Sequence, residues 1–431
     1  MPISAINIGI LGLGTVGSGV VDILNRKGDE IASQIGCPVR IKRILVRDPH
    51  RKRSVEVDRS LLTTDPDDIL KDDDIRIVVE LMGGENPACE YIERALGCGK
   101  HVVTANKEVM AKHGPELLML AHQHGVDLLY EASVGGGIPL IAPFKHDLCA
   151  NRITSIRAII NGTTNYILTR MSREGAEFHV ALRQAQELGY AESDPANDIE
   201  GRDAAYKLAI LATLAFRVDV RPENVYCEGI TRLTARDFRY AQELGYAIKL
   251  LAIGKDTPDG IEARVHPAFI PKDAPLASVD GVFNAVYVEG DLVGNVLFYG
   301  RGAGALPTGS AVVADLVELA RNVRTGTNSR FKPHLNKDVR LKPMADVETR
   351  YYLRMNVLDR YGVLAQMAKV LGDNRISIAS VIQKESNPQA QTAEVVIMTH
   401  PARESSMQKA LGELAGLPIV KDMGSFIRVE D

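Results

Sequence analysis

An acidic loop that leads into an apolar run, residues 189–216, holds the residue types best suited to chemistry. The loop is rich in carboxylates and in residues that break helices and strands: Glu192, Asp194, Pro195, Asn197, Asp198 and Glu200. Asp203 and Lys207 lie four residues apart at the start of the apolar run, on one face of the helix that the run predicts. A lysine among apolar side chains needs a carboxylate partner. The pair is either a structural ion pair or an acid–base device.

A glycine motif near the N-terminus predicts a dinucleotide site. Residues 5–11 are a short apolar run typical of a buried parallel strand. The motif follows at once and leads into a helical pattern: Gly12, Leu13, Gly14, Thr15, Val16 and Gly17. Its first glycine permits a tight turn, the second lets a pyrophosphate approach the backbone, and the third lets the helix pack on the strand.

The residues after the second predicted strand, 39–46, bear on the choice of cofactor. Arg47 comes first, then Asp48, with Arg51, Lys52 and Arg53 close behind. Positive charge at this place suits a 2′-phosphate, so the sequence favours NADP(H) over NAD(H). A solvated basic turn is the alternative, and Asp48 leaves NAD(H) possible.

Two further strands are predicted at residues 75–82 and 101–104, and a ligand lies beyond the carboxyl ends of such strands. Thr104 and Lys107 are therefore expected near the nicotinamide, ahead of a helix predicted to begin at Pro115. The glycine-rich turn at 131–139 exposes carbonyls beside one carboxylate, Glu131. Oxygen ligands of this kind suit a hard monovalent cation, although a plain turn is the alternative.

The second half of the chain changes to a mixed pattern. Residues 152–160 read as a strand, 161–165 as a polar loop that caps the next helix, and 178–188 as an amphipathic helix. A hairpin is predicted at 282–288 and 292–299, and small residues at 300–307 precede a helix that returns to the cofactor. From residue 350 the order of elements is βαββαβ, the ferredoxin-like arrangement.

These patterns predict an α/β protein with three domains. The first is a Rossmann-type parallel sheet at 1–130, completed by a return helix at 305–322. An α+β catalytic and dimerisation domain occupies 131–304, a polar linker broken by prolines occupies 323–349, and a ferredoxin-like domain occupies 350–431. Because the linker would separate the last domain, a chain ending near Arg350 is expected to stay active.

Composition excludes several classes of protein. With 431 residues and a formal net charge of −4, the chain gives no reason to expect nucleic acid or an acidic membrane as partner. No apolar run reaches membrane-spanning length, and the N-terminus lacks the basic start of a signal peptide. The five cysteines are widely spaced without a CxxC motif, which argues against a cysteine zinc site and favours the cytoplasm.

The sequence resembles homoserine dehydrogenase, in the bacterial form with a C-terminal ACT domain, over essentially its whole length. The resemblance is carried by GLGTVG at 12–17, TANK at 104–107, EASVGGGIP at 131–139, NGTTN at 161–165, the acidic stretch at 189–207, GRGAGALPTGSAVVADL at 300–316 and DRYGVLAQMAKVL at 359–371. The family reduces aspartate 4-semialdehyde to homoserine with NAD(P)H, on the route to threonine, methionine and isoleucine.

The resemblance also implies roles for individual residues. Lys207 would be the acid or base, with Asp203 on the substrate or the lysine, and Lys107 near the nicotinamide and the carbonyl oxygen. Glu192 would hold the substrate amino group, with Asp198 beside it, and Gly189 and Gly304 would line the cofactor. A sodium or potassium ion is implied at Glu131, Val134, Gly136 and Ile138, mostly through backbone oxygens.

The resemblance implies partners as well. The ACT domain would bind an amino acid, with threonine as the expected effector, near residues 359–364. A dimerisation module without a ligand is the alternative, and a homodimer or homotetramer is expected. Two other functions stay open for the whole chain: another NAD(P)-dependent semialdehyde reductase, and a non-catalytic nucleotide or amino-acid sensor. An NADPH-oxidation assay with the semialdehyde separates them.

Overall fold

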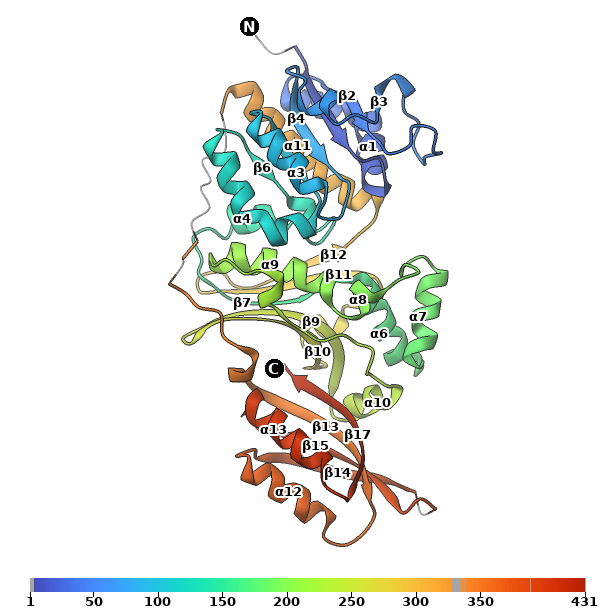
Figure 1. The fold of residues 1–431 in the computed structure, drawn as a ribbon. Helices are drawn as coiled ribbons and strands as arrows, with labels where there is room; N and C mark the ends of the chain where they lie inside the picture. The colour runs from blue at the N-terminus through green and yellow to red at the C-terminus, as the bar shows by residue number, and fades with distance from the viewer. Residues whose placement is uncertain (1–3, 328–334, 337, 388, 431) are drawn as a thin grey trace. The chain divides into compact units, whose positions relative to one another are not determined.

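The computed structural model describes residues 4–327, 335–336, 338–387 and 389–430 (Figure 1). The backbone divides into two compact units, and each gathers segments from distant parts of the chain. The first unit holds residues 1–156, 206–224 and 283–339, and the second holds 157–205, 225–282 and 340–431. Residues 328–334 and 337 of the predicted linker lie outside the described residues.

A parallel sheet forms the centre of the first unit. Its strands follow the order β3 (Leu62–Thr63), β2 (Val39–Leu45), β1 (Ile6–Leu11), β4 (Ile75–Glu80), β5 (His101–Thr104) and β6 (Leu128–Leu129). The largely apolar sequences of β1 and β4 suit strands that are buried on both faces. The strand order reverses between β1 and β4, which is the switch point where such sheets bind ligands, so the predicted Rossmann-type sheet is confirmed.

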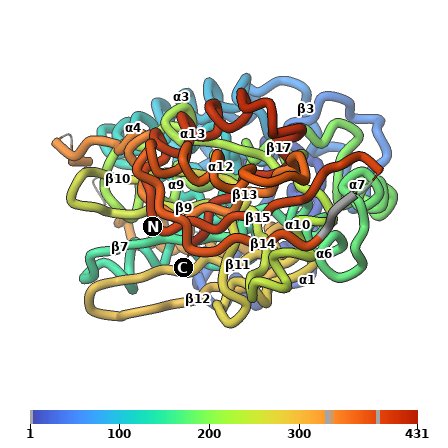
Figure 2. The backbone as a smooth tube through the Cα atoms, turned by 90° about the horizontal axis from the view of Figure 1, so that it is seen from below, coloured from blue at the N-terminus to red at the C-terminus, as the bar shows by residue number. Residues whose placement is uncertain are grey.

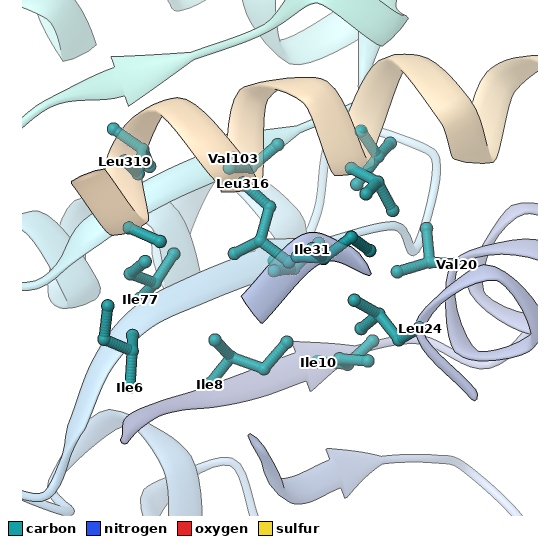
Figure 3. Close-up of a cluster of buried hydrophobic side chains, with 14 of the residues drawn as sticks. Ile6, Ile8, Ile10, Val20, Leu24, Ile31, Ile77, Val103, Leu316 and Leu319 are labelled. Carbon is teal, nitrogen blue, oxygen red and sulfur yellow. The ribbon is translucent and has the colours of Figure 1, made fainter. Parts of the chain in front are cut away.

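Two helices from opposite ends of the chain cover one face of this sheet. They are α1 (Thr15–Ile35) and α11 (Ala305–Thr325), and alternate residues of β1 point into the core between them (Figure 3). The core includes Ile6, Ile8, Ile10, Val20, Leu24, Ile77, Val103, Leu316 and Leu319. The return helix is therefore present, and it runs into the start of the predicted linker because its apolar face continues.

Helix α4 (Lys107–Gln123) begins earlier than predicted. Asn106 is its N-cap and accepts a hydrogen bond from the N–H of Val109, so the helix starts at Lys107 and contains Pro115 in its interior. The prediction that Pro115 begins the helix was wrong. Burial of Val109 and Leu117 on either side of the proline supports a helix that passes through it.

The remaining elements of the first unit are short helices and a hairpin. The helices are η1 (Arg59–Leu61), α2 (Asp67–Leu70), α3 (Ala88–Gly97), η2 (Glu131–Ser133), α5 (Ile141–Lys145) and η3 (Pro222–Asn224). The hairpin joins β11 (Phe283–Gly290) to β12 (Gly294–Arg301), as the sequence predicts. Strand β7 (Ile153–Ile159) begins in the first unit and ends in the second.

The second unit contains helices followed by antiparallel strands. These are α6 (Gly162–Glu174), α7 (Phe178–Glu187), α8 (Ala196–Ile199), β8 (Tyr226–Cys227), α10 (Ala235–Glu243), β9 (Tyr246–Thr257), β10 (Gly260–Pro271), η4 (Pro275–Ser278) and η5 (Met344–Asp346). Helix α9 (Arg202–Phe216) begins in this unit and continues into the first.

Two local predictions in the second unit were wrong. The residues predicted as a loop at 161–165 are helical from Gly162 onward, because the Asn161 side chain caps the helix at Thr164. The acidic loop, predicted to be free of helix, contains α8, one turn long. Pro195 stands directly before α8, where its missing N–H costs nothing.

The C-terminal elements follow the predicted βαββαβ order. They are β13 (Glu348–Leu358), α12 (Val363–Asp373), β14 (Ile378–Asn387), β15 (Thr392–Thr399), β16 (Ala402–Arg403), α13 (Glu404–Ala415) and β17 (Val420–Val429). The antiparallel order is β17-β13-β15-β14, and Figure 2 shows β13, β15 and β14 side by side. The ferredoxin-like arrangement is confirmed.

This C-terminal domain is joined to the rest of the second unit by strand pairing as well as by the chain that precedes it. Strand β17 pairs in parallel with β10, with Arg428 opposite Ala268 and Val429 opposite Phe269. The N–H of Glu430 then donates to Phe269 O at 2.8 Å. The expectation that the linker separates this domain from the rest was wrong. Strand β17 pairs with β13 of this domain on one side and with β10 on the other.

No helix in the described part of the chain is both long enough and apolar enough to span a membrane.

Candidate active site

The glycine turn after β1 has the geometry that a pyrophosphate requires. Gly12 has φ 101°, and a Cβ there would lie 2.9 Å from Leu81 O at the switch point. A Cβ on Gly17 would lie 2.3 Å from Gly12 O, whereas Gly14 faces open space. No described side chain caps α1 at Gly14, so the first N–H groups of that helix are available to a phosphate.

The start of α11 lies beside this turn. A Cβ on Gly19 would lie 2.2 Å from Ala305 O, so α1 and α11 touch through backbone atoms. Gly304, the N-cap of α11, has φ 126° and is exposed. Gly136 approaches the same segment, since its Cβ would lie 2.4 Å from Gly302 O. The structure therefore brings Gly304 and the turn of the predicted cation site together with the fingerprint helix.

The basic loop after β2 surrounds a hollow of about 630 Å³ that is lined by residues between Pro49 and Leu62. Arg53 holds the loop in shape by donating to Asp48 O at 2.6 Å and to Arg51 O at 2.8 Å. Asp48 Oδ1 accepts the N–H of His50 at 2.8 Å. Arg47 and Lys52 are exposed, so their charges remain accessible to a ligand.

A buried carboxylate organises the ends of β4 and β5. Glu80 is 0% exposed; it accepts the Thr104 hydroxyl at 2.6 Å and the N–H of Met82 at 2.7 Å. Burial raises the pKa of Glu80 above its ordinary value, and these hydrogen bonds offset only part of that rise. Thr104 Oγ1 accepts the N–H of Asn106 at 2.9 Å, and Asn106 Nδ2 donates to Gly84 O at 2.7 Å. Glu80 thus fixes the loop that follows β4 and the loop that follows β5, and the second of these leads to Lys107.

We expect Glu80→Ala to raise the KM for the nicotinamide coenzyme by about tenfold, because two buried donors would lose their acceptor. Glu80→Gln retains one acceptor oxygen and should show a smaller rise. Steady-state kinetics with each substrate varied in turn measures the effect. Glu30→Ala, which removes an exposed carboxylate paired with Lys27 on α1, is the control. An unchanged coenzyme KM in both Glu80 variants would contradict the inference that Glu80 holds these loops in place for the coenzyme.

The Glu131 carboxylate is used inside the protein. It accepts the N–H groups of Leu140, Ile141 and Ala142 at 2.6, 2.9 and 2.7 Å, and so caps α5. The N–H of Glu131 donates to Asp315 Oδ2 at 2.8 Å, and burial raises the pKa of Asp315 to about 8. A cation at this turn would therefore be held by backbone oxygens of Glu131, Val134, Gly136 and Ile138.

Within the residues that the structure describes, no group of three or more His, Cys, Asp or Glu side chains is arranged to hold a metal ion.

The acidic loop and α9 carry the substrate side of the predicted site. Asn161 Nδ2 donates to Asp198 Oδ1 at 2.7 Å and to Asp203 Oδ2 at 2.9 Å, so one amide holds both carboxylates. Asp203 is buried, with 3% of its surface exposed. Gly189, at φ 74°, and Glu192 are exposed farther along the loop. This arrangement leaves Glu192 open to a ligand and keeps Asp203 fixed.

Helix α9 carries both members of the predicted acid–base pair. Asp203 and Lys207 are four residues apart, so they lie on one face of this helix. Lys207 is half-buried, and Lys107 is half-buried at the first position of α4.

The sequence reading did not assign site roles to Glu80, Asn106 and Asn161. Asn106 and Asn161 each precede a helix, and an asparagine at an N-cap is a signal that the sequence contains. Glu80 ends an apolar strand, and a charged residue there is a second signal. Their hydrogen-bond partners lie 22–42 residues away, which no local pattern reveals.

Comparisons with known proteins identify the family of this chain. Family models described as homoserine dehydrogenase, its NAD binding domain and the ACT domain match residues 139–317, 12–131 and 351–418. The homoserine dehydrogenase of Synechocystis sp. is 46% identical, over 98% of this chain and 99% of that protein. The structure of a homoserine dehydrogenase from Thiobacillus denitrificans is 44% identical with a TM-score of 0.92, over 99% of this chain and 98% of that one.

This chain belongs to the homoserine dehydrogenase family. It is an NAD(P)-dependent oxidoreductase with a C-terminal ACT domain. A structure described as a hyperthermophilic archaeal homoserine dehydrogenase in complex with NADPH is 28% identical with a TM-score of 0.62, over 73% of this chain and 97% of that one. The alternatives of another semialdehyde reductase and of a non-catalytic sensor are not favoured.

Proposed function

We propose that the enzyme reduces L-aspartate 4-semialdehyde to L-homoserine, reversibly, on the route to threonine, methionine and isoleucine. The observation that carries the proposal is the arrangement on α9, where Asp203 is buried and held by Asn161 and Lys207 lies one turn farther on the same helix. A fixed carboxylate and an ammonium group on one helix face offer a substrate both an acceptor and a proton donor. Membership of the homoserine dehydrogenase family supports the choice of substrate.

NADPH, when bound at the glycine turn, supplies the hydride. Lys207 stabilises the charge that develops on the aldehyde oxygen and donates the proton that the alkoxide needs. Lys107, at the start of α4, lies at the nicotinamide end and assists the same oxygen. Glu192 and Asp198 hold the substrate ammonium group, because a zwitterionic substrate needs carboxylates there. Gly189, and Gly304 in front of α11, leave room for the cofactor.

The proposal is tested by following NADPH oxidation at 340 nm with aspartate 4-semialdehyde. Succinate semialdehyde, which lacks the amino group, is the matched control and should turn over far more slowly if Glu192 and Asp198 read that group. Equal rates with both aldehydes would support a general semialdehyde reductase instead. Absence of turnover with either would overturn the proposed reaction.

The preference for NADP(H) forms the next part of the proposal. Arg47 is exposed just beyond the carboxyl end of β2, and the archaeal relative binds NADPH. We expect Arg47→Ala to lower kcat/KM for NADPH about tenfold, the size of one hydrogen bond to a charged group, with little effect for NADH. Arg40→Ala, at the amino end of the same strand, is the control. Equal losses with both coenzymes would make Arg47 a surface charge.

A sodium or potassium ion at the backbone oxygens of residues 131–138 is also part of the proposal. The turn is buried from Glu131 to Gly136 and packs against the segment before α11. A cation there would stiffen the turn beside the cofactor loop. The capped Glu131 carboxylate gives that turn a fixed shape without the ion.

We further propose that the ACT domain binds threonine at the turn between β13 and α12. Gly362, the N-cap of α12, has φ 81° and is capped by no side chain among the described residues, so N–H groups are available to a carboxylate. Tyr361 and Leu364 are exposed at this turn. A dimer or tetramer formed through such domains would complete the effector site.

A further inference from the structure

Arg428, in the last strand of the ACT domain, lies at the centre of a buried cluster within the second unit. Its side chain is 1% exposed. Nε donates to Glu404 Oε2 at 2.9 Å, and Nη2 donates to Glu404 Oε1 at 2.5 Å. On its other side, Nη1 donates to Glu228 Oε2 at 2.7 Å and Nη2 to the Tyr226 hydroxyl at 3.0 Å. One guanidinium therefore joins two carboxylates from distant parts of the chain.

The two carboxylates come from different parts of the second unit, one from the ACT domain and one from outside it. Glu404 is the first residue of α13 in the ACT domain, and the Tyr351 hydroxyl of β13 also donates to it at 3.0 Å. Glu228 follows β8, and its N–H donates to Val265 O of β10 at 2.8 Å. A movement of α13 would thus be transmitted to Glu228 through the planar guanidinium group of Arg428, which is bonded to both carboxylates.

The loop that carries Glu228 packs directly against the segment before α9. The N–H of Ile230 donates to Ile199 O at 2.9 Å, and Cys227 Sγ donates to Glu200 O at 3.2 Å. A Cβ on Gly229 would lie only 2.2 Å from Ile199 O, so no side chain fits at this position. The loop at residues 227–230, which includes Glu228, therefore holds the backbone at residues 199–200.

That backbone lies between the two carboxylates assigned to the substrate. Asp198 directly precedes Ile199, and Asp203 follows four residues later, with Asn161 holding both. The contacts run without a gap from Glu404 through Arg428, Glu228 and Gly229 to this loop. Because Arg428 and Asp203 are buried and the loop at 227–230 is bonded to Ile199 through backbone, a shift at one end has few ways to be absorbed.

We propose that Arg428 is a positioning residue for the substrate loop, acting through Glu228 and Gly229 on Asp198 and Asp203. The inference rests on the proposed function, since it assumes that these aspartates serve the substrate. It assigns the ACT domain a part in substrate binding even without an effector. An effector that moves α13 would change the KM for the amino-acid substrate rather than for the coenzyme.

Two variants test the proposal in the full-length enzyme. Glu228→Gln removes a charge from a side chain that is 26% exposed and should leave the fold intact, whereas Gly229→Ala forces a Cβ against Ile199. Each is expected to raise the KM for homoserine about tenfold, with the KM for NADP near that of the wild type. The melting temperature should stay near that of the wild type in Glu228→Gln and fall in Gly229→Ala, where the new Cβ displaces Ile199 O. Arg428→Met should give the same split where it folds.

The control is Glu243→Gln. Glu243 pairs with Lys384 of the ACT domain at 2.7 Å, so it also joins the ACT domain to the rest of the second unit. It belongs to α10 and not to the substrate loop. Its kinetics should match the wild type. The inference is overturned if Glu228→Gln and Gly229→Ala leave the homoserine KM unchanged, or raise both KM values equally. A wild-type enzyme that does not oxidise homoserine would overturn the proposed function together with it.

Discussion

Lys207→Ala is expected to lower kcat by a factor of roughly 10²–10⁴, the usual loss when a general acid is removed. Lys207 is half-buried on the same face of α9 as Asp203, and it is the residue that we propose donates a proton to the substrate oxygen. The glycine turn after β1 does not depend on this side chain. Binding of NADPH, measured by fluorescence titration, should therefore be unchanged.

Two further tests show whether the loss of activity comes from the missing proton donor. Lys207→Arg keeps the positive charge but cannot release a proton, so it should remain far below wild type. Added methylamine should restore part of the activity of Lys207→Ala by supplying an ammonium group in its place. Lys71→Ala, which removes an exposed lysine paired with Asp67 on α2, is the control and should retain full activity. Near-wild-type turnover of Lys207→Ala would move the role to Lys107 or to water.

A chain ending after residue 346 is expected to lose its fold and its activity. Arg264 is 1% exposed and would lose Glu430, and Asp237 is 0% exposed and would lose Arg354, now at 2.9 Å. Removing one partner of a buried ion pair costs about 3–5 kcal/mol. Two such losses are comparable to the whole stability of a typical domain, about 5–15 kcal/mol. Strand β10 would also expose the edge that β17 covers.

The measurements are soluble yield, melting temperature and NADPH oxidation. Lys384→Ala in the full-length chain is the control, because it removes only an exposed contact between the same parts and should shift the melting temperature little. A truncated chain that is soluble and active, with a melting temperature near that of the wild type, would show that β10 and its buried charges do not need the ACT domain. Truncation is therefore a poor test of threonine inhibition, which calls for substitutions confined to the turn at residues 359–364.

The sequence by itself determined the elements that depend on short-range patterns. The apolar runs of the parallel strands, the glycine fingerprint and the βαββαβ order at the C-terminus all repeat within a few residues. The placing of Asp203 and Lys207 on one face of α9 is another such element, because a spacing of four places two residues on one helix face whatever surrounds the helix. Family membership follows from motifs of this kind.

Helix boundaries were less well determined. Pro115 looked like a start, and the residues after Asn161 looked like a loop, because proline and polar residues have strong local preferences. In the structure, burial on the apolar faces of α4 and α6 outweighs these preferences. The N-cap asparagines one position before each helix mark the true starts.

Only the tertiary structure decided how charged groups are paired. The sequence contains Glu80, Asn161, Glu228 and Arg428, but nothing local says that Glu80 meets Thr104 or that Arg428 meets Glu228, 200 residues away. The linker looked like a separator because composition describes only the segment itself. The pairing of β17 with β10 depends instead on which strand edges are left open once both sheets have formed, and that is a property of the assembled chain.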